Sequence, residues 1–268
     1  MKCRILFGAP AALCAGVALL GATTESVHAG GFDVAIVAAA ATSPTDPRFT
    51  DPRDKLMGTG LFNSVTIINA NTTTPTLADL QQFHAVLTWS NFDYANPIAL
   101  GNVFADYVDA GGGVVVATFA NSSTGANRFL SGRWITDGYE IIPSQSGNIT
   151  GTATLGNVLL PGHPIMDGVG SFNGGTSSFR PNTTALTAHG IKVAEWSDGR
   201  TLVATSSLFP NRADLGMYPV SADALASGWV TSTDGALLMA NALLYTIPTP
   251  GAAALLAIGA LAGARRRR

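Results

Sequence analysis

Four short, largely apolar runs in the first half of the chain constrain its fold more than any other feature. They are residues 32–40, 64–69, 85–89 and 114–119, and glycine, proline or polar residues bound each of them. A strand with one face in water alternates apolar and polar residues, whereas an unbroken apolar strand is buried on both faces. The runs therefore predict strands inside a sheet that is covered on both sides.

Helical patterns separate these runs. Residues 53–61 predict a helix that follows a polar, proline-containing loop, and Thr76 with Asp79 three residues later forms a capping-box pattern. The clearest helix has an apolar stripe at helical spacing, formed by Leu100, Val103, Phe104, Tyr107 and Val108. Three glycines, residues 111–113, end it. Strands that alternate with helices predict a mainly parallel sheet between two helical layers, an α/β three-layer sandwich.

The second half of the chain is less regular. It has four further candidate strands, residues 139–142, 151–160, 191–196 and 202–206. Asp198-Gly199 lies between the last two and predicts a hairpin turn. Residues 234–245 predict a closing helix, with Asp234 as its N-cap. We find no internal repeat, so residues 30–246 are expected to form one domain.

The first 29 residues have the pattern of an export signal. Lys2 and Arg4 precede a mostly apolar stretch, and the segment finishes on the small residue Ala29. A positive start, an apolar middle and a small-residue end are what signal peptidase recognises. The alternative is a first buried helix, although glycine and proline interrupt the run. We expect signal peptidase to remove residues 1–29.

Residues 247–268 carry a second address pattern. Pro248 and Pro250 precede an apolar run, and the chain closes on four arginines, Arg265, Arg266, Arg267 and Arg268. A helix over residues 251–264 would be about 21 Å long, which is shorter than the ~30 Å hydrocarbon core of a bilayer. Such a segment suits a transient anchor in the inner membrane, with the arginines on the cytoplasmic side.

This order of proline motif, apolar run and arginine cluster resembles the PEP-CTERM sorting tails, with Thr249 in place of their central acid. The resemblance implies processing by an exosortase-type transpeptidase and delivery to the cell envelope, the outer surface or the extracellular space. The alternative is a plain C-terminal tail anchor.

Charge and cysteine content exclude several classes of function. Removing Lys2, Arg4, Glu25 and the terminal arginines from 15 basic and 17 acidic residues leaves 9 and 16, a net charge of about −7. An acidic domain argues against a nucleic-acid partner. Cys3 and Cys14 both lie in the export signal. The mature domain would therefore contain no disulfide, zinc–thiolate site or thiol nucleophile.

The middle of the chain contains an ordered set of short motifs. They are Val34-Ala35-Ile36-Val37, the glycine-rich junction at residues 107–115, the His-Pro-Ile-Met-Asp-Gly-Val segment at 163–169, the Asp198-Gly199 turn, and Asn241 in the last helix. In this order they resemble the class I glutamine-amidotransferase-like superfamily, especially its trehalose-utilisation-like, non-amidotransferase branches. The resemblance implies a flavodoxin-like, amidotransferase-like sandwich over residues 30–246.

The resemblance also indicates where a reactive group would lie. Catalytic members of the superfamily carry a cysteine nucleophile on a tight turn after the fourth strand, with a histidine base and backbone amides that stabilise the oxyanion. This chain has Thr-Phe-Ala-Asn-Ser-Ser at residues 118–123 and lacks a Gly-x-nucleophile-x-Gly elbow. A Ser122 nucleophile with His163 as its base is one reading. Purely structural roles for both residues are the other.

Polar and aromatic residues at the predicted carboxyl ends of the third and fourth strands are the candidates for a ligand site. Open parallel sheets bind ligands at this edge, and aromatic faces beside amide, carboxylate and hydroxyl groups suit a glycan. The candidates at this edge are Ser90, Asn91, Asp93, Asn121 and Ser122, and His163 from the motif at residues 163–169 is a further candidate. Trp89 and Phe92 in the same region have an alternative role as a cover of the core. No cofactor or metal is predicted.

These patterns predict an exported cell-envelope or extracellular-matrix protein with a non-catalytic domain that has a binding or structural role. Its expected partners are signal peptidase, an exosortase-type transpeptidase and a glycan or matrix ligand. The alternative function is a sugar-modifying enzyme or a hydrolase that uses polar residues at the strand ends.

Overall fold

The computed structural model describes residues 31–248, and an eight-stranded sheet in the order β2-β1-β3-β4-β12-β11-β10-β8 forms its centre. The parallel strands are β1 (Phe32–Ala38), β2 (Phe62–Asn69), β3 (Ala85–Thr88), β4 (Gly113–Ala117) and β12 (Arg212–Leu215). Three antiparallel strands extend the sheet, namely β11 (Thr201–Ser206), β10 (Gly190–Trp196) and β8 (Leu155–Val158). The predicted α/β sandwich with a mainly parallel sheet is confirmed.

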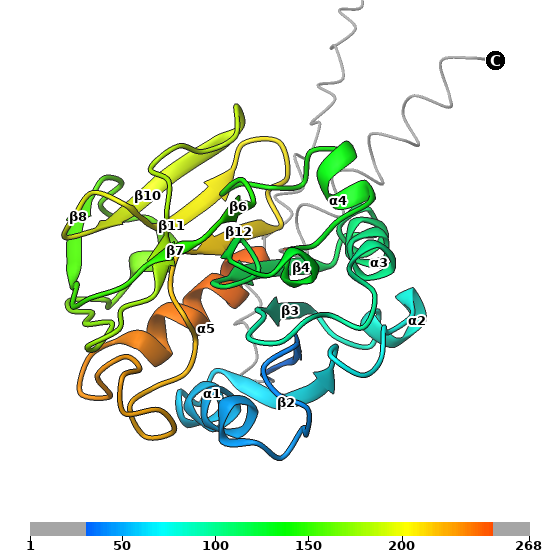
Figure 1. The fold of residues 1–268 in the computed structure, drawn as a ribbon, viewed down its shortest axis with the longest axis horizontal. Coiled ribbons are helices and arrows are strands. Elements are labelled where there is room, and N and C mark those ends of the chain that lie inside the picture. The colour runs from blue at the N-terminus through cyan, green and yellow to red at the C-terminus, as the bar shows by residue number, and fades with distance from the viewer. Residues whose placement is uncertain (1–30, 249–268) are drawn as a thin grey trace, which may run out of the picture.

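Helices cover both faces of this sheet. Figure 1 shows α1 (Pro47–Gly58) and α5 (Gly235–Thr246) on one side of the parallel strands. The other side carries α2 (Leu77–Leu80), α3 (Pro97–Asp109) and α4 (Arg133–Thr136). Shorter elements lie outside the main sheet: β5 (Ser122–Ser123) pairs with β6 (Gln145–Ser146), β7 (Asn148–Ile149) pairs with β9 (Arg180–Pro181), and η1 (Ala126–Arg128) and η2 (Pro164–Met166) are single turns.

The alternation of side chains along β1 explains its unbroken apolar sequence. Val34 and Ile36 belong to the core under α1 and α5, whereas Ala35 and Val37 belong to the core under α3. Side chains of a strand point to opposite faces in turn, so a strand between two helical layers needs apolar residues at every position.

Local capping signals set the ends of the first helices. The Asp79 side chain accepts from the Thr76 backbone N–H, and Thr76 accepts from that of Asp79, which confirms the predicted capping box. The prediction that the first helix begins at residue 53 is wrong. Asp46 caps α1 by accepting from the Arg48 N–H, and Pro47 occupies the first helical position, where no N–H is required. The Asp-Pro pair therefore begins the helix and is not part of the preceding loop.

The second half of the chain departs further from its prediction. Residues 139–142 do not form a strand; they run irregularly beside β12, and the Ile142 N–H donates to Asp214. Only Leu155–Val158 of residues 151–160 is a strand. The hairpin around Asp198-Gly199 is confirmed, with Gly199 at a φ of +80°. Strand β12, which joins the parallel and antiparallel halves of the sheet, has no counterpart in the prediction.

The closing helix is confirmed as α5, and Asp234 lies at its N-cap, as predicted. Asp234 makes no side-chain hydrogen bond to the first turn of α5. Its carboxylate accepts instead from the backbone N–H groups of Gly170 and Ser171, and so ties the helix start to the segment that follows η2.

The predicted export signal and sorting tail lie outside the described residues, apart from Ile247 and Pro248. Within residues 31–248, no helix is both long and apolar enough to cross a membrane.

Candidate functional site

The topology of the sheet creates a crevice at the carboxyl ends of β1 and β3. From β1 the chain continues through α1 to β2, whereas from β3 it continues through α3 to β4 on the opposite face. The loops that follow the two neighbouring strands therefore turn away from each other. Open parallel sheets bind ligands at such a switch point, outside the carboxyl ends of the strands.

A cleft of about 430 Å³ opens at this point. The first turn of α1 contributes Asp46 and Arg48 to its lining, and Asn91 follows β3. The remaining walls come from Phe119, which follows β4, from Phe179, and from the loop between β12 and α5, residues 216–234. The volume lies in the range of small-molecule sites, which are about 300–1,000 Å³.

Two charged residues form a fixed pair at the mouth of the cleft. The Arg48 Nε donates to Asp46 Oδ1 and its Nη2 donates to Oδ2, each at 2.9 Å. The guanidinium also lies 5.3 Å from the centre of the Phe92 ring, a cation–π arrangement. The hydrogen bond from Arg48 is the main cause that lowers the pKa of Asp46 below its usual value. Both groups are therefore charged at neutral pH, and together they carry no net charge.

Three aromatic rings form the apolar side of the cleft. The ring centre of Phe119 lies 4.9 Å from that of Phe179 and 5.1 Å from that of Tyr218. Burial raises the pKa of the Tyr218 phenol, so its hydroxyl is neutral. No residue in the described range hydrogen-bonds to the Tyr218 hydroxyl or to the Asn91 side chain, so each keeps its hydrogen-bonding capacity for a ligand.

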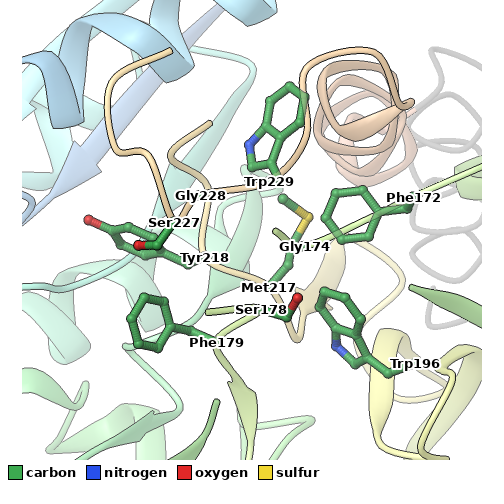
Figure 2. Close-up of a pocket in the computed structure, with 10 residues that line it drawn as sticks. All are labelled: Phe172, Gly174, Ser178, Phe179, Trp196, Met217, Tyr218, Ser227, Gly228 and Trp229. Atoms are coloured by element: carbon green, nitrogen blue, oxygen red, sulfur yellow. The ribbon is translucent and has the colours of Figure 1, made fainter. Parts of the chain in front are cut away.

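A small apolar void lies next to the cleft, and Phe179 and Tyr218 line both. Figure 2 shows Met217 at the centre of this region, with Phe172 and Trp196 on the side away from Tyr218 and Trp229 above Met217. The void measures about 10 Å³, which is room for about one water molecule. It is therefore a packing gap in the core, and the larger cleft is the candidate ligand site.

Three of the six predicted site residues are buried in structural roles. The Ser90 hydroxyl donates to the Arg128 carbonyl, and the Ser122 hydroxyl donates to the carbonyl of Gly147. The Asn121 side chain accepts from Thr118 and is 2% exposed. None of the three lines the cleft, although all lie beyond the carboxyl ends of β3 and β4, as predicted.

The other three candidates do not form one site, because His163 lies away from Asn91 and Asp93. Asn91 lines the cleft. Asp93 is exposed at the same edge and pairs with Arg128 at 3.5 Å. His163 caps η2 and packs its ring 4.9 Å from that of Tyr245, near the end of α5.

The structure places His163 and Ser122 at opposite ends of β4. Gly113 begins β4 so close to α5 that an added Cβ would lie 2.5 Å from Thr246 Oγ1. His163 contacts the residue next to Thr246, so it lies at the amino end of the strand. Ser122 follows the carboxyl end. The two side chains are therefore not brought together.

Sequence reasoning missed most residues that line the cleft. The sequence pattern predicts a loop at Asp46 and Arg48 and the end of a strand at Phe119. Tyr218 and Phe179 lie in segments with no periodic pattern. Asp-Pro-Arg occurs at residues 46–48, where it begins α1, and again at residues 51–53, inside the helix, so this order alone does not mark the helix start. Among residues 31–248 there is no cluster of three or more histidine, cysteine or acidic residues that could hold a metal.

Solved structures with a similar fold exist. A ThuA-like protein from Bacteroides uniformis superposes with a TM-score of 0.58 at 14% identity, over 84% of this chain and 95% of that one. A ThuA-like protein from Parabacteroides merdae gives 0.50 at 13% identity, over 81% and 90%. The glutaminase domain of Trypanosoma brucei CTPS, with bound acivicin, gives 0.46 at 10% identity, over 81% and 96%.

No family model and no curated protein matches the sequence. At such low identity the structural likeness concerns the fold alone. The chain thus has the α/β fold of the ThuA-like proteins, in agreement with the three-layer sandwich that the sequence predicted.

Proposed function

We propose that this domain is a non-catalytic binding module whose ligand is a hydroxyl-rich molecule such as a glycan. The observation that carries the proposal is the cleft at the switch point of the sheet, about 430 Å³ in volume. It combines aromatic rings with an amide, a phenol and a carboxylate–guanidinium pair. Apolar ring faces pack against the C–H faces of a sugar, while the polar groups bond its hydroxyls.

The surroundings of Ser122 support a role without catalysis. A serine nucleophile needs a base within hydrogen-bond reach and access to substrate. The Ser122 side chain is fully buried, donates to a backbone carbonyl, and accepts from the Asn182 N–H. His163 lies at the other end of β4. Residues 31–248 also contain no cysteine. The enzyme alternative would therefore require other groups in the cleft.

Two mild substitutions in the cleft test the binding proposal. Asn91→Ala and Tyr218→Phe remove one amide and one hydroxyl that bond to no other described residue, so the fold should be retained. Each lost hydrogen bond is worth about 1 kcal/mol, so the double variant should bind a glycan about thirtyfold more weakly. Affinity electrophoresis against a panel of soluble neutral polysaccharides measures the change.

The control for this experiment is Asn127→Ala, since Asn127 is an exposed asparagine at the same edge that does not line the cleft. It should bind as the unaltered protein does. Equal binding by the double variant and by the unaltered protein would place the ligand elsewhere on the molecule.

We further propose that the protein is exported and delivered to the cell envelope or the extracellular matrix. The support is the sequence pattern of residues 1–29 and 247–268, which provides substrates for signal peptidase and an exosortase-type transpeptidase. Mass spectrometry of the protein recovered from the cell surface should give a chain that starts near Gly30 and ends near residues 248–251. Recovery of surface protein with Arg265–Arg268 intact would contradict removal of the tail.

A further inference from the structure

We infer that the cleft is selective for uncharged ligands, and that Asp46 is the residue that excludes anionic ones. This inference rests on the proposed function and specifies the ligand class of the same site. Arg48 lines the cleft. An arginine in a cleft ordinarily indicates a site for an anionic ligand. The geometry around Arg48 indicates the opposite.

The carboxylate of Asp46 already occupies the side of Arg48 that an anionic ligand would use. An arginine binds a carboxylate or phosphate through two parallel N–H groups. Here Nε and Nη2, one such pair, both donate to Asp46. A ligand carboxylate that approached the remaining Nη1 would come close to the Asp46 carboxylate and be repelled by it.

The pair is held in place from both sides. Asp46 Oδ1 accepts the Arg48 backbone N–H at 2.9 Å as the cap of α1, so the carboxylate is fixed to the start of the helix. The Phe92 ring packs against the guanidinium. Because neither group needs to move, the pair can meet a ligand in one preset arrangement, which lowers the entropy cost of binding.

The groups that the pair leaves open suit hydroxyls. In the described part of the chain, Arg48 Nη1 has no hydrogen-bond partner, while Asp46 Oδ2 accepts only from Arg48 and keeps acceptor capacity. A sugar hydroxyl both donates and accepts, so two adjacent hydroxyls can accept from Nη1 and donate to Oδ2. Asn91 and the Tyr218 hydroxyl offer the same mixed character on the facing walls.

The other charges near the cleft do not create an anion site. Asp51, on α1, accepts two hydrogen bonds from Ser221 in loop 216–234. Arg128 pairs with Asp93. These residues add two carboxylates and one cation to the neutral Asp46–Arg48 pair. An anionic ligand would therefore enter a region whose net charge is already negative.

Substitution of Asp46 by asparagine tests the inference, because it should remove the preference of the cleft for uncharged over anionic ligands. Asparagine caps helices as well as aspartate does, so α1 should be retained, and thermal unfolding of the variant would verify this. The probes are glucose and glucuronate, which share a ring and differ by one carboxylate. Titrations of each are followed by the amide chemical shifts of the cleft residues. Asp167→Asn is the matched control, because it removes one exposed carboxylate beside η2, away from the cleft.

The unaltered protein and Asp167→Asn should both bind glucose about fivefold more tightly than glucuronate, the ratio given by one unit-charge interaction at about 4 Å in a water-like dielectric. Asp46→Asn frees the Arg48 charge and should bind glucuronate at least as tightly as glucose. The inference is wrong if the unaltered protein prefers glucuronate, or if Asp46→Asn has the same ratio of glucose to glucuronate affinity as the unaltered protein. Either result would leave the binding proposal in place. No shift in the cleft with either sugar would count against both.

Discussion

Replacement of Asp214 by alanine is expected to lower the free energy of unfolding by about 3–5 kcal/mol, the usual cost when one member of a buried ion pair is removed. Asp214 is 1% exposed, and Arg212, its partner at 2.8 Å, is fully buried. The variant would leave the guanidinium without its counter-ion inside the protein. It would also leave the Ile142 N–H, which donates to Asp214, without an acceptor. Equilibrium denaturation with urea measures the loss.

The environment of Arg212 explains why the effect should be large. The guanidinium lies 4.3 Å from the centre of the Trp134 ring and donates to the Tyr139 carbonyl. One charge thus links β12 to α4 and to the irregular segment that follows it. The matched control is the double variant Arg212→Met, Asp214→Leu, which removes both charges and keeps similar volumes. It should be considerably more stable than Asp214→Ala. A loss below about 1 kcal/mol in the single variant would show that the pair is not buried as described.

Replacement of Trp229 by alanine is expected to cost about 3–5 kcal/mol, because it opens a large cavity in the core. Trp229 is 2% exposed, and its Nε1 donates to the Pro219 carbonyl at 2.8 Å. Both residues belong to loop 216–234, which also carries Tyr218. The variant should therefore loosen the wall of the cleft as well as the core. Denaturation gives the stability loss, and hydrogen exchange of residues 217–230 reports on the loop.

Trp229→Phe separates the contribution of the ring volume to stability from that of the Nε1 hydrogen bond to Pro219. It retains most of the ring volume but leaves the Pro219 carbonyl without its donor, so we expect a loss of about 1–3 kcal/mol. Exchange protection of the loop that stays unchanged in Trp229→Ala would contradict the role of Trp229 in holding the cleft wall.

The first half of the sheet was predictable because its strands are buried on both faces and therefore appear in the sequence as unbroken apolar runs. The sequence did not predict β12, because Arg212 and Asp214 break the apolar pattern of that strand. The two residues are two apart and point to the same face, while Ala213 and Leu215 point to the other core. Arg212 and Asp214 could be assigned to a buried strand only if their contacts with Tyr139 and Ile142 were known. Those two residues lie far away in the sequence.

The candidate site was predicted less completely than the fold. The edge of the sheet and Asn91 follow from strand order, which local patterns indicate. Phe179 and Tyr218 reach the cleft from long irregular segments. Such segments have no hydrophobic periodicity that could indicate which side chains point inward. Ser122 and Asn121 were selected for their chemistry, but tight turns after β4 bury both. Only tertiary contacts determine which of several polar loop residues face a cleft.

The most direct test of the central claim, that the cleft binds a hydroxyl-rich ligand without converting it, is a nuclear magnetic resonance time course of the protein with a neutral glycan that it binds. We expect shifts of the amide signals of Asn91, Phe119 and Tyr218, and ligand signals that show no new chemical species throughout. Shifts confined to another part of the molecule, or steady conversion of the ligand that Ser122→Ala abolishes, would contradict it.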